Sequence, residues 1–182
     1  MHTMNDDIRQ VLFSGERIAA IVKEMGARIS ADYSGKNLLL VSVLKGSIVF
    51  MSDLMRAITI PCSIDFMAVS SYGTGTKTSG VVKIIKDLDI NLKGYDVLIV
   101  EDILDSGLTL SYIRELLLGR SPKSIRLCTL FDKPDRRTVN IQADYVGSVV
   151  PDEFIVGYGL DYAEKYRNLP YVGILKPEVY GG

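Results

Sequence analysis

Residues 97–110, VLIVEDILDSGLTL, decide the fold and point to the site. The first five residues are apolar except for Glu101, and they are typical of a buried strand. Asp102 and Asp105 follow, and the small-residue turn 106–109 then leads toward a helix. Because backbone N–H groups at a helix N-terminus attract anions, this stretch places three carboxylates beside a predicted anion-binding turn. Its ligand must have one part that suits acids and another that is itself an anion.

A sugar phosphate would use both halves of this stretch. Its hydroxyls can donate to the carboxylates of Glu101 and Asp102, while its phosphate accepts from the backbone of the turn. Ser106 and Thr109 add hydroxyl donors, and Gly107 allows a close approach of the backbone. No Gly-Lys-Ser/Thr follows, so the turn favours a monophosphate over a triphosphate. The spacing alone equally fits an acidic capping turn before an ordinary helix.

Apolar segments of strand length alternate with segments of helical periodicity along the chain. Strands are expected at 38–44, 62–70, 81–85, 97–101 and 124–130, with shorter ones at 145–150, 154–156 and 171–175. Helices are expected at 14–31, with Ser14 as N-cap, at 47–58 and at 109–118. This alternation predicts an α/β fold with a doubly wound, mostly parallel sheet flanked by helices. Ligands of such sheets bind at the carboxyl ends of strands, here near 44–46, 101–109 and 131–133.

The composition is that of an ordinary globular chain. Its 182 residues favour a single domain, 1–182. The formal net charge of −1 argues against binding of nucleic acid or of a membrane surface through bulk charge. We see neither a secretory signal nor an apolar run long enough to span a bilayer. Cys62 and Cys128 are expected to be buried, reduced thiols, and the protein is expected to be cytoplasmic.

His2 is the only histidine, and this narrows the possible chemistry. A Ser-His-Asp or Cys-His nucleophile is excluded, and so is a histidine-based metal site. Any general base must be a carboxylate, a lysine, a tyrosine or the substrate itself. Any metal must be a hard cation that oxygen atoms hold.

Five segments resemble the type I phosphoribosyltransferases. The stretch 97–110 is similar to the family's phosphoribosyl-pyrophosphate motif. The other four are LKGSIVF (44–50), which resembles the pyrophosphate-binding turn, SSYGTGTKTSG (70–80), which resembles the mobile lid, and LFDKP (130–134) and VPDEFIVGYGLDYAEKYRNLP (150–170), which resemble the base-binding region of the 6-oxopurine branch. The first motif points to the superfamily and the last two to a hypoxanthine-type enzyme.

The resemblance implies a reaction and an organisation of the chain. The expected reaction belongs to purine salvage: magnesium-dependent transfer of 5-phosphoribosyl from phosphoribosyl pyrophosphate to hypoxanthine or guanine, giving IMP or GMP and pyrophosphate. A core at about 35–135 would carry a hood made of the N-terminal segment and 136–176. Family members form dimers or tetramers, so a homodimer or homotetramer is expected. The alternatives are a xanthine-preferring enzyme and a nucleic-acid-binding regulator of the same fold; the near-neutral charge and Asp105 weigh against the regulator.

The resemblance assigns the residues around the ribose 5-phosphate. The loop 105–109 would bind the 5′-phosphate, although some relatives carry a charged or polar residue in place of Leu108. Glu101 and Asp102 would lie under the ribose hydroxyls and the water shell of the magnesium ion, where their charge favours an oxocarbenium-like transition state. Asp105 would act as the general base that removes the purine N7 proton.

The resemblance also assigns the pyrophosphate side. Lys45 and Gly46 would offer backbone donors to pyrophosphate, and the family commonly has a cis peptide bond at the position of Leu44–Lys45. Asp161 would bind magnesium. Arg167 would pair with pyrophosphate oxygens, which suit the fork of a guanidinium. Asp161 and Arg167 lie six residues apart, so we expect a loop between them rather than one helix face.

The remaining assignments concern the purine and the lid above it. Lys133 would donate to the 6-oxo group of the purine, although most lysines are simply solvated at the surface. Phe154 would stack on the purine ring, and the backbone of Ile155 would face its exocyclic edge. Ser71 and Tyr72 would begin the lid that excludes water during transfer.

Overall fold

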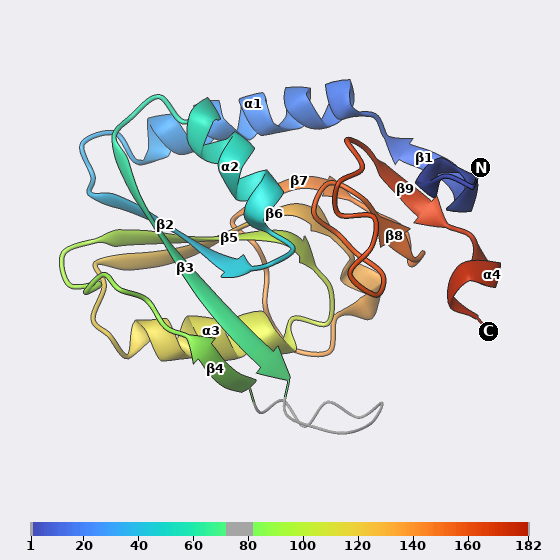
Figure 1. Ribbon diagram of the computed structural model, residues 1–182. Coiled ribbons are helices and arrows are strands. Elements are labelled where there is room, and N and C mark those ends of the chain that lie inside the picture. Colours follow the sequence, from blue (N-terminus) through green and yellow to red (C-terminus); the bar gives the residue numbers. More distant parts are fainter. Residues whose placement is uncertain (1, 72–81, 182) are drawn as a thin grey trace.

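The computed structural model describes residues 2–71 and 82–181, which form an α/β arrangement with two sheets (Figure 1). The strands are β1 (Ile8–Phe13), β2 (Leu38–Leu44), β3 (Cys62–Ser71), β4 (Val82–Lys86), β5 (Asp96–Leu104), β6 (Ser124–Asp132), β7 (Tyr145–Val149), β8 (Ile155–Val156) and β9 (Val172–Leu175). The helices are α1 (Gly15–Asp32), α2 (Ile48–Ala57), α3 (Leu108–Leu118) and α4 (Pro177–Tyr180), with 3-10 turns η1 (Met4–Asp7) and η2 (Pro134–Arg136). Within the described part of the chain, none of these helices is long and apolar enough to cross a membrane.

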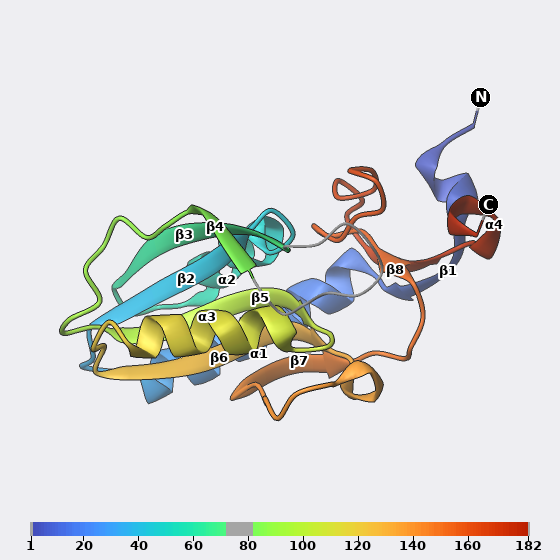
Figure 2. The ribbon, with the colours of Figure 1, turned by 90° about the horizontal axis from the view of Figure 1, so that it is seen from below.

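The main sheet has six strands in the order β4-β3-β2-β5-β6-β7. All neighbouring pairs are parallel except β3 with β4. Helices α1 and α2 lie on one face and α3 on the other (Figures 1 and 2). Alternate residues of β2 serve the two faces: Leu38 and Leu40 belong to the core under α1 and α2, whereas Leu39 and Val41 belong to the core under α3. The doubly wound, mostly parallel sheet is therefore confirmed.

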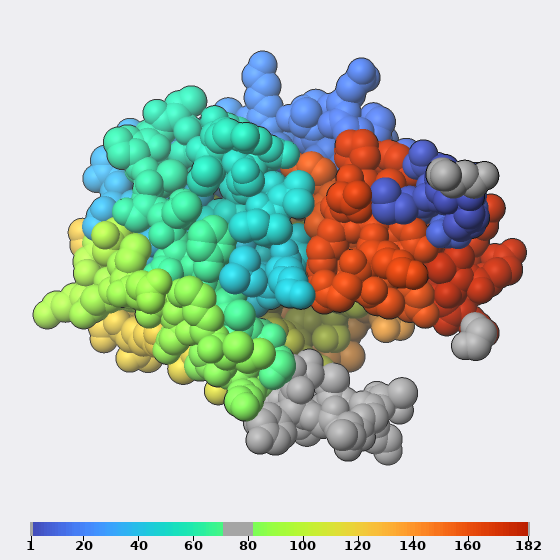
Figure 3. All heavy atoms as spheres, viewed as in Figure 1, coloured from blue at the N-terminus to red at the C-terminus, as the bar shows by residue number. Residues whose placement is uncertain are grey.

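A smaller antiparallel sheet, β1-β9-β8, joins segments from both ends of the described chain. In Figure 1 it lies beyond the carboxyl end of β5, and in Figure 3 the blue N-terminal and orange-to-red C-terminal segments pack into one lobe. Strand β1 has no counterpart among the predicted elements, because three of its six residues are exposed and its sequence, IRQVLF, lacks a clear apolar alternation. Pairing with β9, from Ile8 with Leu175 to Phe13 with Val172, supplies what its own sequence does not.

Two expectations about boundaries need correction. Strand β7 joins the main sheet through Cys128 and Tyr145, so the segment 136–176 is not all hood; Tyr145 is fully buried there. Strand β5 continues to Leu104, beyond the expected end at Glu101, because its pairing with β6 continues to Asp132. The expected N-cap at Ser14 is confirmed, since its Oγ accepts a 3.2 Å hydrogen bond from the backbone N–H of Arg17.

Candidate active site

Two cavities open at the carboxyl ends of β5 and β6, where the sheet topology predicts a ligand site. The first has a volume of about 410 Å³ and the second about 160 Å³. The predicted site residues that line the first are Gly46, Asp102, Asp105, Lys133, Phe154, Ile155, Asp161 and Arg167. Those that line the second are Glu101, Asp105, Ser106, Gly107 and Thr109. Segments far apart in the sequence thus meet at this edge, and Asp105 lies between the two cavities.

Asp102 lines the first cavity and is pressed against the turn that follows β2. A Cβ atom added to Gly46 would come within 2.2 Å of the Asp102 Oδ2 atom, so only glycine fits at residue 46 while the carboxylate keeps this position. The Asp102 Oδ1 atom accepts a 2.8 Å hydrogen bond from the N–H of Ile103. Burial raises the pKa of Asp102 to about 6, because that hydrogen bond and the charge of Arg167 offset the desolvation only in part.

Glu101 precedes Asp102 in the strand and lines the second cavity instead of the first. Its Oε1 atom is buried and has no hydrogen-bond partner among the described residues. Burial, followed by the charge of Asp102, raises the pKa of Glu101 well above its ordinary value. The structure therefore does not gather the two acids under a single group; each is presented to a different side of the strand end.

The turn after β5 has the geometry of an anion-binding loop. Gly107 is the N-cap of α3 and has φ 83° and ψ −4°, a left-handed conformation that glycine adopts without strain. A Cβ atom on Gly107 would also come within 2.5 Å of the Ile141 side chain. Leu108 does not line the second cavity, and its backbone N–H donates to the Oγ of Ser106 at 3.4 Å. Its side chain is therefore not part of the predicted phosphate contact.

Lys133 directly follows β6 and is only 7% exposed, which excludes a solvated surface lysine. Its Nζ donates to the carbonyl oxygen of Glu153 at 2.9 Å and lies 3.9 Å from the Asp152 carboxylate. The backbone N–H of Lys133 donates to the carbonyl of Leu104 at 3.0 Å, which ties the ends of β5 and β6 together. An ammonium group is thus held inside the first cavity by the segment that precedes β8.

Phe154 and Ile155, which the resemblance assigns to the purine, both line the first cavity. Phe154 is 37% exposed, and its ring stacks on Tyr180 with a centroid distance of 4.8 Å and contacts the edge of Tyr162. Ile155 is buried and pairs with Ile174 in the smaller sheet. The aromatic ring is therefore held from one side by protein rings at the cavity wall, as a stacking platform for a flat ligand requires.

Asp161 and Arg167 meet across a loop, as their spacing predicts. The Nη2 atom of Arg167 lies 3.0 Å from Oδ1 of Asp161, and Nη1 donates to the carbonyl of Gly159 at 2.7 Å. The Nε of Arg167 is buried and has no partner in the described part of the protein. Arg167 therefore forms a salt bridge and also lines the first cavity, where its Nε remains an unused donor.

The turn after β2 borders the first cavity through Gly46. The Leu44–Lys45 peptide bond is cis, as the resemblance implies. Gly46 lines the first cavity, whereas the Lys45 side chain lies at the surface, 3.2 Å from Glu164. Ser71 is the last residue of β3, and Tyr72, with the rest of the predicted lid to residue 80, lies outside the described residues.

Comparison with known proteins identifies the family. A model of the phosphoribosyl transferase domain matches residues 10–163. The chain belongs to the phosphoribosyltransferase family. It is 56% identical, over 97% of its own length and 98% of the relative's, to the hypoxanthine-guanine phosphoribosyltransferase of Streptococcus agalactiae. It superimposes on a hypoxanthine phosphoribosyltransferase from Staphylococcus aureus with a TM-score of 0.97 and 55% identity, over 100% of both chains.

Other relatives of this phosphoribosyltransferase are longer than the chain. The bifunctional protein TilS/HprT of Listeria innocua is 57% identical over 178 residues, which make up 98% of this chain but only 28% of that protein. The chain thus spans about 28% of the length of the bifunctional relatives that it matches. The predicted family and the type I phosphoribosyltransferase fold are both confirmed.

Two arginines of this phosphoribosyltransferase site were missed from the sequence. The Nε of Arg136 lies 3.5 Å from Oδ1 of Asp105 and 3.8 Å from Oδ1 of Asp152, at the wall of the first cavity. Arg137 reaches behind the loop that follows β5, where its Nε donates to the carbonyl of Asp105 at 3.0 Å. The available signal was the pair of arginines in DKPDRR, two residues beyond the segment already assigned to the purine.

The described residues of this phosphoribosyltransferase do not form a complete metal cage. No group of three or more acids, histidines or cysteines among them could hold an ion. Asp102 and Asp161 nevertheless line one cavity, and the negative charge of Asp161 raises the pKa of Asp102. Magnesium usually takes one or two carboxylates and keeps water or substrate phosphate oxygens as its other ligands. This oxygen-only set fits an ion that arrives with a phosphorylated substrate.

Proposed function

We propose that the protein transfers the 5-phosphoribosyl group from phosphoribosyl pyrophosphate to hypoxanthine or guanine. The C1′–O bond to pyrophosphate breaks, a bond forms between C1′ and a purine ring nitrogen, and the purine loses one proton. The products are IMP or GMP and pyrophosphate. This assignment agrees with the names of the relatives that the chain matches along nearly their whole length.

The buried ammonium group of Lys133 is the observation that carries the proposal. An ammonium has three donors and no acceptor, so it selects a ligand with an acceptor at that point. The 6-oxo group of hypoxanthine, guanine or xanthine meets this requirement, whereas the 6-amino group of adenine does not. Lys133 shares its cavity with Phe154, whose ring is available for stacking, and with Asp105, the proposed base.

The ribose and the leaving group would occupy the two sides of Asp105. The loop 105–109 binds the 5′-phosphate through backbone N–H groups and the hydroxyls of Ser106 and Thr109. Asp102 accepts from a ribose hydroxyl, and its negative charge stabilises the positive charge that develops at C1′. Arg167 and the backbone around Gly46 bind pyrophosphate. Asp105 accepts the purine proton as the new bond forms.

Magnesium would be held by Asp102 and Asp161, with the remaining ligands supplied by water and substrate. It supplies charge neutralisation to the pyrophosphate group. Glu101 is not a direct ligand in this arrangement, because it lines the second cavity. We further propose that Ser71 and Tyr72 begin a lid over this site, and that the protein acts in the cytoplasm as a homodimer or homotetramer. The cysteines Cys62 and Cys128 are free, which suits a reducing compartment.

A panel of four bases tests the function. The protein is incubated with phosphoribosyl pyrophosphate, magnesium and hypoxanthine, guanine, xanthine or adenine in turn, and nucleotide formation is measured. We expect IMP and GMP, little product from xanthine and none from adenine. Absence of nucleotide with every base would rule out the enzyme. Turnover with xanthine above that with hypoxanthine would replace the substrate assignment but leave the reaction intact.

Asp105→Asn tests the proposed base. We expect kcat to fall by about a hundredfold to ten-thousandfold, the usual contribution of a general base, while KM for both substrates changes little. Asp135→Asn is the matched control, because Asp135 is an exposed acid in η2 and does not line either cavity. Equal turnover of D105N and D135N would refute proton removal by Asp105.

A further inference from the structure

The backbone of the loop after β5 is sorted by polarity. The carbonyls of Leu104, Asp105 and Ser106 all accept hydrogen bonds from groups in the segment 133–138. In contrast, no hydrogen bond between described residues uses the N–H of Ser106 or Gly107. A strand-to-helix turn normally leaves N–H groups free at the helix start; here the acceptors on the same peptides are held on the opposite side. The free donors belong to residues that line the second cavity.

Arg137 supplies most of this restraint. Its Nε donates to the carbonyl of Asp105 at 3.0 Å, its Nη2 to the carbonyl of Leu104 at 3.4 Å and its Nη1 to the carbonyl of Ile141 at 2.6 Å. Its Nη2 also pairs with the Asp132 carboxylate, at the end of β6. The side chain is only 16% exposed, so these bonds lie largely away from competing water. One guanidinium thus joins the ends of β5 and β6 to the loop.

Neighbours of Arg137 complete the support from behind. The backbone N–H of Thr138 donates to the carbonyl of Ser106 at 3.0 Å, and its hydroxyl donates to the same oxygen at 3.3 Å. The Gly107 Cα has no room behind it, since an added Cβ would come within 3.1 Å of Arg137 Cδ and of the Val139 side chain. The segment 137–141 therefore acts as a backing for the loop while lying outside the second cavity itself.

We propose that Arg137 is a positioning residue for 5′-phosphate binding: it anchors the carbonyl groups of the loop after β5, and this orients the N–H groups toward the phosphate. The inference rests on the proposed function, because it takes the loop as the phosphate subsite. It is a statement about geometry and not about charge. The positive charge of Arg137 is paired with Asp132, and the planar fork, not the charge, spans the three carbonyls.

Arg137→Lys separates geometry from charge. A lysine keeps the positive charge but, with a single ammonium group, cannot reach all of these acceptors. Dissociation constants of IMP and of inosine, which lacks the 5′-phosphate, are measured by calorimetry for wild type and variant. We expect R137K to weaken IMP about tenfold or more and inosine less than about twofold; tenfold is 1.4 kcal/mol. A general loss of structure would weaken both ligands alike.

Two further variants make the result decisive. Thr138→Val removes one exposed bond to the same loop and is expected to weaken IMP about threefold, roughly one modest hydrogen bond, with inosine unchanged. Arg120→Lys is the control, because Arg120 makes two 2.8 Å bonds to Asp87 far from either cavity; both affinities should be unchanged. If R137K does not fold, T138V decides alone.

The outcomes have distinct meanings. IMP affinity in R137K equal to that of wild type, or an equal loss for IMP and inosine, overturns the positioning role while the proposed function stands. Unchanged IMP affinity in T138V counts against it in the same way. A wild-type protein that binds IMP no better than inosine would instead remove the phosphate subsite, and with it both the proposed function and this inference.

Discussion

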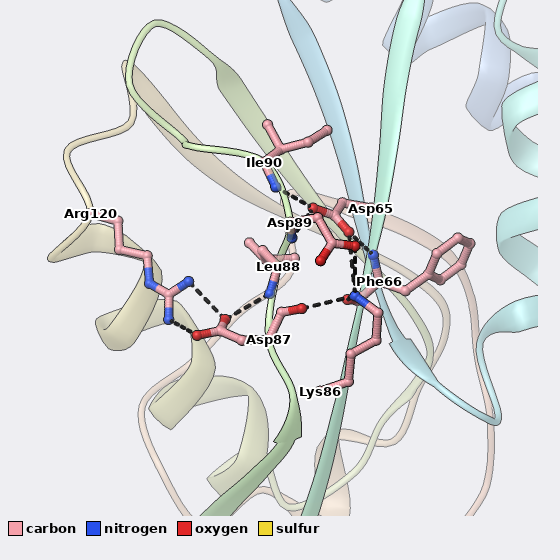
Figure 4. A network of polar contacts seen from close by, with 8 residues as sticks. All are labelled: Asp65, Phe66, Lys86, Asp87, Leu88, Asp89, Ile90 and Arg120. Carbon is pink, nitrogen blue, oxygen red and sulfur yellow. Dashed lines mark hydrogen bonds and ion pairs between the residues drawn. The ribbon is translucent and has the colours of Figure 1, made fainter.

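Two buried carboxylate sites on the main sheet are built in opposite ways. Asp65, in β3, is 6% exposed, and both of its carboxylate oxygens accept backbone hydrogen bonds (Figure 4). Its Oδ1 accepts from the N–H of Phe66 at 2.7 Å, and its Oδ2 accepts from the N–H groups of Asp89 and Ile90 at 2.8 and 2.9 Å. The Nζ atom of Lys86 lies 3.9 Å from Oδ1 of Asp65 and donates to the carbonyl oxygen of Phe66.

The site at the end of β5 has few of these partners. Asp102 is 9% exposed and accepts one hydrogen bond, from the residue that follows it. Glu101 has a buried oxygen with no partner among the described residues. The pKa values of both acids are raised, first of all by burial. Burial of a carboxylate without compensating partners costs stability. We therefore interpret the unused acceptor oxygens of Glu101 and Asp102 as groups that can bind a ligand.

The comparison shows that burial of an acid does not by itself reveal its purpose. The Asp65 network fastens the segment 87–90, which follows β4, onto the sheet. Arg120, two residues after the end of α3, extends the network through Asp87. Its hydrogen bonds are complete without a ligand. In contrast, Glu101 and Asp102 of β5 lack hydrogen-bond partners for some of their acceptor oxygens in the protein alone. Variants at the two sites should therefore separate stability from activity.

Asp102→Asn is expected to have the largest effect, and on turnover. Asparagine keeps the size and an acceptor for the Ile103 N–H but removes the negative charge that faces the developing positive charge at C1′. We expect kcat with phosphoribosyl pyrophosphate and hypoxanthine to fall about a thousandfold, which is about 4 kcal/mol. The free energy of unfolding at neutral pH should not fall, because the variant no longer buries a poorly compensated charge.

Denaturant unfolding of D102N beside the steady-state rate checks both halves of this expectation. If D102N loses stability and activity in parallel, Asp102 supports the fold as Asp65 does, and the proposed difference between the two sites is wrong.

Asp65→Ala should have the converse effect. The variant leaves three backbone N–H groups without their acceptor, and we expect a loss of about 3 kcal/mol in the free energy of unfolding. The kcat of the folded fraction should stay near the wild-type value, since Asp65 lines neither cavity. Asp87→Ala is the matched control: Asp87 belongs to the same network but is 47% exposed, and its loss should cost less than about 1 kcal/mol.

Equilibrium unfolding in urea measures the free energy of unfolding of wild type, D65A and D87A side by side. If D65A is as stable as D87A, the hydrogen bonds of the buried carboxylate contribute no more than an exposed ion pair does.

The sequence predicts the main sheet well because its central strands contain long apolar runs, such as Val97 to Val100 in β5. In β2, six of seven residues are buried, and the alternation of β2, α2 and β3 has no other good interpretation. It fails at β1, where pairing with a distant strand and not local pattern decides the structure. It also places the end of β5 too early, since charged residues normally mark the end of a strand, while pairing with β6 keeps Glu101 to Leu104 extended.

At the site, too, some features follow from local sequence and others depend on contacts between distant segments. The motif in 97–110 predicts which residues meet a ligand, and the structure brings Asp102, Lys133 and Arg167 into one cavity. Glu101 and Asp102 face different cavities because successive residues of a strand point to opposite faces, and the expected strand ended at Glu101, one residue too early to show this. Arg137 was missed for another reason: it reaches the site through backbone carbonyls at the end of β5 and in the loop that follows, which lie more than thirty residues away in the sequence.

The pH dependence of stability gives the smallest and sharpest test of the comparison. The pKa of Asp102 is raised from the ordinary aspartate value of 3.8 to about 6 in the folded protein. Between these values the native state binds more protons than the unfolded state, so the free energy of unfolding falls as pH rises. From about pH 4 to pH 7.5 wild type should lose on the order of 2 kcal/mol relative to D102N.

Urea unfolding of both proteins, in buffer with a chelator, measures this difference at each pH. The raised pKa of Glu101 gives wild type and D102N a slope of the same sign, so it largely cancels between them. If hydrogen bonds instead stabilised the ionised form of Asp102, wild type would gain stability over D102N as pH rises. The sign of the slope therefore decides whether the buried acid of β5 is a support of the fold or a group held ready for a ligand.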